Sequence, residues 1–139
     1  PLVVFCAYRH NVRTVCDALA KEYGRHQVVA FSGNESSTQR NKAVEHFQNG
    51  QANFFVGTSA AAKGLTLHRA STMIYYSNNY SLETRLQSQD RIHRIGQKNK
   101  CTYIDLVVPN TVDDAILKRL KQKKELSSMV LDDLIEIIK

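Results

Sequence analysis

Five short apolar runs are spaced along the chain, and segments with helical periodicity separate them. Each run is apolar at nearly every position, which is typical of strands buried on both faces of a parallel sheet. Strands that alternate with amphipathic helices favour a three-layer α/β domain, with a parallel central sheet and helices on both faces. The predicted strands are Leu2 to Ala7, Val28 to Phe31, Phe54 to Val56, Met73 to Tyr76 and Thr102 to Val108.

Apolar spacing, capping residues and glycines predict the helices between these strands. In a sheet of this kind, ligands bind at the carboxyl ends of the strands, so function is expected in the loops that follow them. The predicted helices are one with Val12, Val15, Cys16, Leu19 and Ala20 on one face, one that Ser36 or Ser37 caps and that ends at Asn49-Gly50, and one that Ser81 caps and that runs to about Ile95 before Gly96.

Two helical segments are predicted after Pro109-Asn110, where the last strand is broken. We therefore divide the chain into a lobe, residues 1–108, and a C-terminal helical extension, residues 109–139. The basic run from Lys118 to Lys124 is interpreted as a solvated helix face. The extension is predicted to pack back onto the lobe through an apolar stripe formed by Val130, Leu131, Leu134, Ile137 and Ile138.

The composition fits one compact domain of 139 residues that starts directly in a strand, which we interpret as a fragment of a larger protein. No stretch approaches the roughly 20 apolar residues of a membrane helix, so no membrane partner is expected. Cys6, Cys16 and Cys101 are odd in number and widely spaced, which supports neither a disulfide framework nor a zinc site and favours a reducing compartment. The formal charge of +6 favours an anionic partner such as nucleic acid, but solubility alone can account for it.

The strongest chemical signal is a pair of arginines near the end of the third predicted helix. Gln87, Arg91 and Arg94 stand at i, i+4 and i+7, so on a helix they would form one polar stripe. Two guanidinium groups suit a polyphosphate, because both are permanently charged and donate in a fixed fork. The alternative is a solvated face with salt bridges to Asp90 or Glu83. The opposite, apolar side of the helix would carry Leu82, Leu86, Ile92 and a packed, hydrogen-bonded His93.

A loop of small residues from Gly57 to Gly64 is the second signal. Small residues let a backbone approach phosphate oxygens, and hydroxyl groups can bond them. The loop is not a phosphate loop of the Walker type, because Ala62 and Gly64 stand where glycine and a hydroxyl residue are required. An ordinary tight strand-to-helix turn is the alternative interpretation. Tyr75 and Tyr76, which could stack on bases, lie in a predicted buried strand and are assigned to the core.

The stretch from Gln87 to Gln97 closely resembles the last signature motif of the Swi/Snf-like remodeller family of helicase superfamily two. The family pattern is Gln-Ala-x-x-Arg-x-x-Arg-Ile-Gly-Gln, from which only Ser88 departs. The resemblance implies a second RecA-like lobe and extends over nearly the whole chain. The other blocks, in the family's order, are Val3 to Cys6, Phe31 to Gly33 with Gln39-Arg40 and Phe47 to Gly50, and Gly57 to Leu67.

The same resemblance implies a role for individual residues. Arg91 and Arg94 would be arginine fingers, which reach across a cleft to ATP held by the first RecA-like lobe. Lys63, where the family commonly has a bulky apolar residue, could contact phosphate or simply be solvated, and Ala61 and Ala62 replace usual glycines. The implied nucleotide-binding residues are Gln87, Gly64 and Thr66, and the implied DNA-binding residues are Thr58, Ser59, Ser32, Gly33 and Lys63.

The resulting hypothesis is the second motor lobe of an ATP-dependent, DNA-stimulated translocase on duplex DNA. Its partners would be the DNA phosphate backbone and the first lobe of the same polypeptide, which would hold most of the ATP and Mg²⁺. No metal site is expected in this chain, and the chain alone should not hydrolyse ATP. A lobe of a strand-separating helicase and a non-enzymatic interaction domain with a RecA-like shell stay open as alternatives. Short loops favour an intracellular location in a microbial or viral-host cytoplasm over a eukaryotic nucleus.

Overall fold

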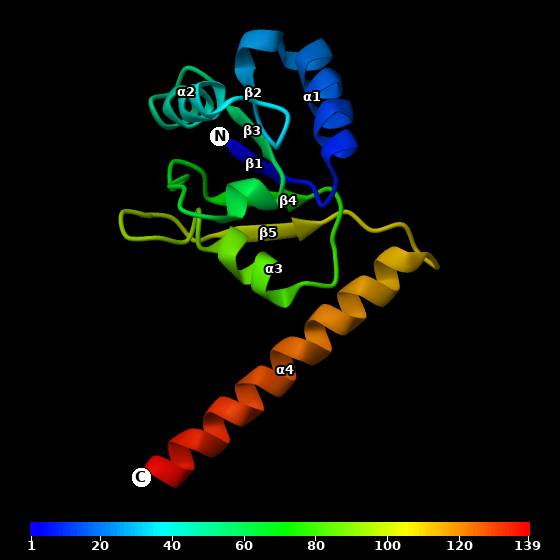
Figure 1. Cartoon of the computed structure of the whole chain (residues 1–139), viewed down its shortest axis with the longest axis vertical. Helices are drawn as coiled ribbons and strands as arrows, with labels where there is room; N and C mark the ends of the chain where they lie inside the picture. The colour runs from blue at the N-terminus through cyan, green and yellow to red at the C-terminus, as the bar shows by residue number, and fades with distance from the viewer.

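A five-stranded parallel sheet forms the centre of the molecule (Figure 1). The computed structural model describes residues 1–139, apart from the side chain of Ala62. The strand order is β2-β3-β1-β4-β5, and every neighbouring pair is parallel. This arrangement confirms the predicted α/β fold. The strands are β1 (Leu2–Phe5), β2 (Val28–Phe31), β3 (Phe54–Gly57), β4 (Thr72–Tyr75) and β5 (Thr102–Asp105).

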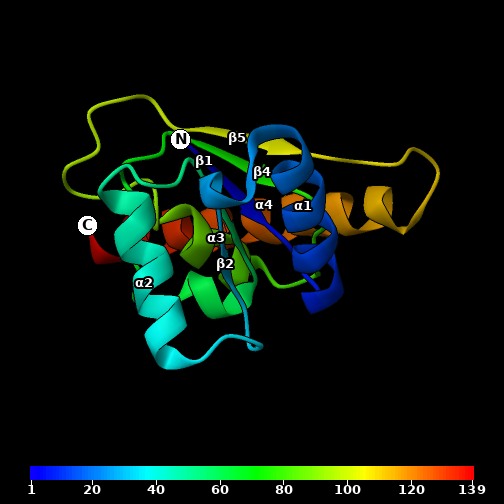
Figure 2. The same ribbon diagram turned by 90° about the horizontal axis from the view of Figure 1, so that it is seen from above.

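Alternate residues of the strands contribute to two cores on opposite faces of the sheet. Val4 and Val56 face α1 (Arg9–Tyr23), whose buried side is formed by Val12, Val15 and Cys16. On the other face, Phe55 packs edge-on against Phe47 of α2 (Ser37–Gln48), with ring centroids 5.6 Å apart. In Figures 1 and 2, α1 and α2 accordingly flank the strands from opposite sides. Two short 3₁₀ helices, η1 (Arg25–Gln27) and η2 (Ser59–Ala62), complete this part of the chain.

The layer formed by α1 covers only part of its face of the sheet. Helix α1 packs over β2 and β3. On the same face Ile104 of β5 is 42% exposed, and Leu106, which follows the strand, is 47% exposed. The strand predicted to reach Val108 ends at Asp105.

Helix α2 begins as the sequence predicts, and the structure selects Ser36 over Ser37 as its N-cap. The Ser36 hydroxyl accepts a hydrogen bond from the Gln39 backbone N–H at 3.2 Å, and the Gln39 side-chain oxygen accepts one from the Ser36 N–H at 2.9 Å. This reciprocal capping box satisfies two backbone donors that the first helical turn leaves without partners.

Helix α3 is shorter than predicted, because it spans Leu82–Gln89 and does not reach Ile95. Other groups bond the carbonyl oxygens that a longer helix would use. Gln87 O accepts from the Arg91 side chain at 2.9 Å, and Arg91 O accepts from Leu67 N at 2.9 Å. Residues 90–97 therefore form a series of turns, called the arginine segment below, and the predicted helical stripe of Gln87, Arg91 and Arg94 is wrong.

The C-terminal extension is one helix, α4 (Val112–Ile138), instead of two segments. Its first turns bury Ile116 and Leu120, and the helix then extends beyond the sheet (Figure 1). The predicted packing of its apolar stripe on the lobe is not found in this structure: Val130, Leu131, Leu134, Ile137 and Ile138 are between 47% and 83% exposed. The stripe lacks a partner among the described residues because the straight helix carries it past the sheet. The division at residue 109 stays a prediction.

Candidate functional site

Arg91 and Arg94 converge on one backbone oxygen. The Arg94 guanidinium donates to Leu65 O at 2.8 Å, and the Arg91 guanidinium donates to the same oxygen at 3.3 Å. Arg94 also donates to the Thr66 hydroxyl at 3.2 Å. Among the described side chains neither arginine forms an ion pair with Asp90 or Glu83. The salt bridges of the alternative interpretation are therefore not present. Arg94 is exposed and Arg91 half-buried, which leaves donor capacity on both groups.

The segment that accepts the arginines includes two of the predicted nucleotide-binding residues. Gly64 has φ of +70°, and a Cβ atom placed there would meet no atom within 4 Å. The neighbouring surface is therefore open, and the half-buried Thr66 presents its hydroxyl to Arg94. Gln87, the third predicted residue, uses its side-chain amide to donate to Glu83 at 2.8 Å instead of joining the arginines.

The arginine segment is anchored by Ile92 and Gln97. Ile92 is fully buried in the core that also contains Leu67. The Gln97 amide donates to His68 O at 3.1 Å, to Ala70 O at 2.7 Å and to Ile92 O at 3.1 Å. These bonds tie the segment to the connection between β3 and β4. Sequence reasoning gave Gln97 no role of its own, although it closes the quoted motif.

His93 and Ile95 lie on the outside of the same segment. The prediction of a packed His93 is wrong, because its side chain is exposed. Since α3 ends before it, His93 does not share the apolar helical face on which the prediction rested. Ile95 is 99% exposed and lies beside Arg94. Tyr75 is buried as predicted, but the assignment of Tyr76 to the core is wrong, because β4 ends at Tyr75 and the Tyr76 side chain is 37% exposed.

The predicted DNA-binding residues follow β2 and β3, whose ends are in register at Phe31 and Gly57. They divide into two groups. Ser32 is 1% exposed, and its N–H and hydroxyl donate to Glu35 at 2.6 and 2.7 Å. Thr58 is 5% exposed, and its hydroxyl caps η2 by accepting from Ala60 N at 3.4 Å. The hydroxyls of both residues are thus engaged within the chain, whereas the others are exposed: Gly33, Ser59 and Lys63.

Arg9 places a cation beside these exposed residues, and the sequence analysis did not predict it as a site residue. A Cβ atom at Gly33 would lie 2.6 Å from the Arg9 guanidinium, so Gly33 leaves space for that side chain. Among the predicted departures from the family, Ala61 is buried in the core, and the side chain of Ala62 lies outside the described residues.

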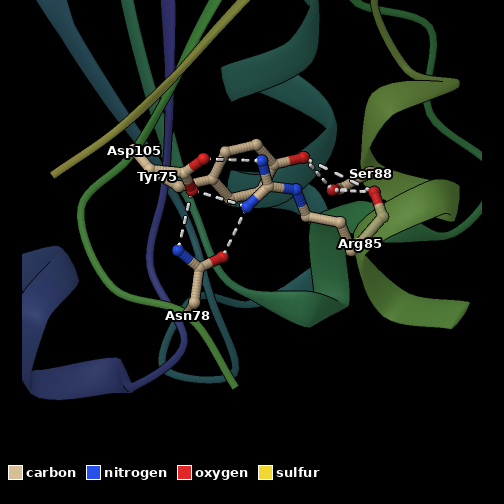
Figure 3. A network of polar contacts seen from close by, with 5 residues as sticks. All are labelled: Tyr75, Asn78, Arg85, Ser88 and Asp105. Atoms are coloured by element: carbon tan, nitrogen blue, oxygen red, sulfur yellow. Dashed lines mark hydrogen bonds and ion pairs between the residues drawn. The ribbon is translucent and has the colours of Figure 1, made fainter. Parts of the chain in front are cut away.

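A polar network joins α3 to the carboxyl ends of β4 and β5 (Figure 3). The Arg85 guanidinium donates to both carboxylate oxygens of Asp105, at 2.6 and 2.9 Å, and to Asn78 at 2.8 Å. It also lies 3.7 Å from the centroid of the Tyr75 ring. The Tyr75 hydroxyl and the Ser88 hydroxyl are 2.6 Å apart. No member of this network was predicted as a site residue.

The pKa values of two groups reflect this environment. Burial is the largest cause of the rise in the pKa of Tyr75 to about 12. Burial also favours the protonated form of Asp105, but the hydrogen bonds from Arg85 and Asn78, with the Arg85 charge, outweigh it and lower the pKa of this carboxyl group. Asp105 therefore remains ionised beside Arg85 at neutral pH.

Comparison with known proteins identifies the family. The helicase conserved C-terminal domain matches residues 1–96, which include all the predicted site residues. The chain belongs to this helicase C-terminal domain family. Its relatives include human "Chromatin-remodeling ATPase INO80", which is 32% identical over 111 residues, or 78% of this chain and 7% of the relative. Yeast (Saccharomyces cerevisiae) "Transcription regulatory protein SNF2" is 32% identical over 106 residues, or 74% of this chain and 6% of the relative.

These relatives confirm the resemblance to a Swi/Snf-like second lobe. The crystal structure of the C-terminal part of the Fun30 ATPase domain has a TM-score of 0.76 over 86% of this chain and 38% of that chain. At 16% identity, this likeness supports the RecA-like fold alone. Because the chain spans less than a tenth of the length of these two curated relatives, the activity of the whole protein remains a proposal.

The predicted microbial or viral-host cytoplasm is contradicted by the comparisons. The relatives are eukaryotic chromatin-remodelling and transcription regulators, and one, from yeast (Saccharomyces cerevisiae), is named "Nuclear protein STH1/NPS1". They point to a nucleus. Short loops were a poor guide, because loop length reflects how elements are joined and carries no information on the compartment.

Two further findings concern metals and membranes. Among the residues that the structure describes, no group of three or more His, Cys, Asp or Glu side chains could hold a metal ion. No helix within the described part of the chain has the length and apolar character needed to cross a membrane.

Proposed function

We propose that this chain is the second motor lobe of an ATP-driven translocase on duplex DNA. In this proposal Arg91 and Arg94 are arginine fingers for ATP bound by a first RecA-like lobe of the same polypeptide, which also holds Mg²⁺. ATP supplies the phosphoryl group that is transferred to water. The loops after β2 and β3 contact the phosphate backbone of DNA.

The convergence of both arginines on Leu65 O is the observation that supports this proposal most directly. A single neutral carbonyl oxygen cannot use all the donors of two guanidinium groups. Phosphate oxygens are charged and form shorter, stronger hydrogen bonds with arginine, so they can replace the carbonyl as acceptors. In the transition state of phosphoryl transfer, two guanidinium groups stabilise the charge on the equatorial oxygens.

The neighbouring residues suit a nucleotide as well. Gly64 leaves open surface beside the arginines, and Thr66 offers a hydroxyl that a ribose could bond. The chain itself offers no cluster of carboxylates for Mg²⁺ among its described residues, which is why the proposal assigns the metal to the first lobe.

The proposed DNA contacts use the exposed groups at the ends of β2 and β3. Ser59, Lys63 and the backbone at Gly33 can reach phosphate oxygens, while the buried hydroxyls of Ser32 and Thr58 hold these loops in shape. Such contacts are insensitive to base sequence and weaken with salt.

DNA-stimulated ATP turnover of a polypeptide with both lobes tests the proposal. Arg94→Ala should lower turnover by about a hundredfold or more while ATP binding persists, and this chain alone should be inactive. The control is Arg13→Ala, which removes an exposed arginine paired with Asp17 at 3.9 Å. Near-normal turnover in Arg94→Ala would refute the finger role, and lack of turnover in the wild-type two-lobe polypeptide would favour a non-enzymatic interaction domain. Separation of a duplex would instead favour a helicase.

A further inference from the structure

We infer that Arg85 is a positioning residue for the arginine fingers: by fixing α3 to the carboxyl ends of β4 and β5, it sets where the arginine segment places Arg91 and Arg94. The inference rests on the proposed function. It concerns a residue that contacts neither of the two proposed fingers directly, and it extends the active machinery to the polar network in Figure 3.

The contacts of Arg85 join three separate parts of the fold. Its partner Asp105 ends β5, and Tyr75, over whose ring its guanidinium lies, ends β4. These two strand ends are paired in register. Asn78 belongs to the loop between β4 and α3, and its amide donates to Asp105 at 2.9 Å. Arg85 is therefore held by a closed ring of hydrogen bonds and by an aromatic face.

The same network fixes the backbone of α3. Arg85 O accepts from the Ser88 hydroxyl at 2.7 Å, and Ser88 contacts the buried Tyr75 hydroxyl. Only Gln89 and Asp90 separate Ser88 from Arg91. A rotation of α3 about its contact with the sheet would thus move the arginine segment, whose other end is held at Ile92 and Gln97.

The Arg85–Asp105 ion pair is better suited to orienting α3 than to stabilising the fold. The Arg85 and Asp105 side chains are only 14% and 24% exposed, so desolvation offsets much of their attraction. A partly buried, two-pronged pair nevertheless permits few geometries, whereas apolar side chains of similar size would permit many. The rate is sensitive to such geometry, because misplacement of a catalytic group by about 1 Å can cost a hundredfold.

The test is a double-mutant cycle on the two-lobe polypeptide, in which DNA-stimulated turnover is measured against ATP concentration. Arg85→Met should lower kcat by about tenfold or more and change the KM for ATP by less than about threefold. In a background that carries both Arg91→Ala and Arg94→Ala, the same substitution should lower kcat by no more than about twofold, because both groups that it positions are gone. Arg13→Met, at the exposed Arg13–Asp17 pair, is the matched control and should change neither quantity.

A second variant guards against a folding defect. Arg85→Lys keeps a cation beside Asp105 but loses the planar fork, so it should also lower kcat selectively. Wild-type kcat in a folded Arg85→Lys protein, or an equal further loss from Arg85→Met in the background that lacks both Arg91 and Arg94, would overturn the positioning role.

The outcomes separate this inference from the proposed function. Full turnover in Arg94→Ala alone would remove the finger role, and the positioning role with it. Loss of turnover in Arg94→Ala with normal kcat in both Arg85 variants would overturn the positioning role only.

Discussion

Replacement of Ile92 by alanine tests whether the arginine segment is part of the hydrophobic core. Ile92 is fully buried in the cluster with Leu67 and Tyr75. Ile92→Ala removes three buried carbons, worth about 2.4 kcal/mol at roughly 0.8 kcal/mol each, and leaves a cavity that adds to the loss. We therefore expect the free energy of unfolding to fall by about 3–4 kcal/mol.

Ile95 supplies a control of the same residue type in the same segment. Because its side chain is 99% exposed, Ile95→Ala should change the free energy of unfolding by less than about 0.5 kcal/mol. The assay is urea unfolding of the 139-residue chain followed by circular dichroism, with equal slopes required for all variants. In a chain of this size the Ile92→Ala loss corresponds to a fall in Tm of roughly 10 °C.

Equal stabilities of the two variants would refute this account. The core would then not hold Ile92, and the arginine segment would have to be positioned by the Gln97 hydrogen bonds and α3 alone.

Three other predictions use the same chain. Ser36→Ala should lower the free energy of unfolding by about 1 kcal/mol through loss of the α2 cap, whereas Ser37→Ala, just inside the helix, should cost less; the reverse order in urea unfolding would contradict the assigned cap. Burial raises the pKa of Cys6 to about 12 and that of Cys16 to about 11, so a thiol reagent at pH 8 should modify the half-buried Cys101 first, and Cys101→Ser should abolish this fast phase. The pKa of Asp105 is lowered, so the folded state binds its proton less readily than the unfolded state. This group therefore stabilises the fold above its unfolded pKa and loses that contribution as pH falls through the lower folded value. The difference in the free energy of unfolding between wild type and Asp105→Asn should shrink over this acid range and stay constant above it.

The strands could be predicted from sequence because a strand buried on both faces leaves a continuous apolar run. Val28 to Phe31 is such a run, and the structure gives β2 the same bounds. Local signals also predicted α2, where a serine cap marks the beginning and Asn49-Gly50 marks the end. These features depend on neighbouring residues, which the sequence shows directly.

The end of α3 could not be predicted because distant groups determine it. The periodicity through Ile92 is compatible with a helix, but Leu67 N bonds the carbonyl of Arg91 and the Gln97 side chain bonds that of Ile92. The exposure of His93 follows from the same interruption. Arg85 was missed for a related reason: nothing in its neighbouring residues reveals that Asp105, twenty positions away, lies within hydrogen-bonding distance.

The site residues were identified by their motif, and their roles stay predictions, but their arrangement is informative about coupling. Two of the exposed candidates for DNA contact, Ser59 and Lys63, precede Leu65 on the same connection between β3 and β4. Arg91 and Arg94 bond the carbonyl of Leu65. If phosphate oxygens replace that carbonyl as the acceptors, the arginines release the connection that carries the DNA contacts. Engagement of ATP and a change of grip on DNA would then be linked through a few residues of one connection, with no rearrangement of the sheet required.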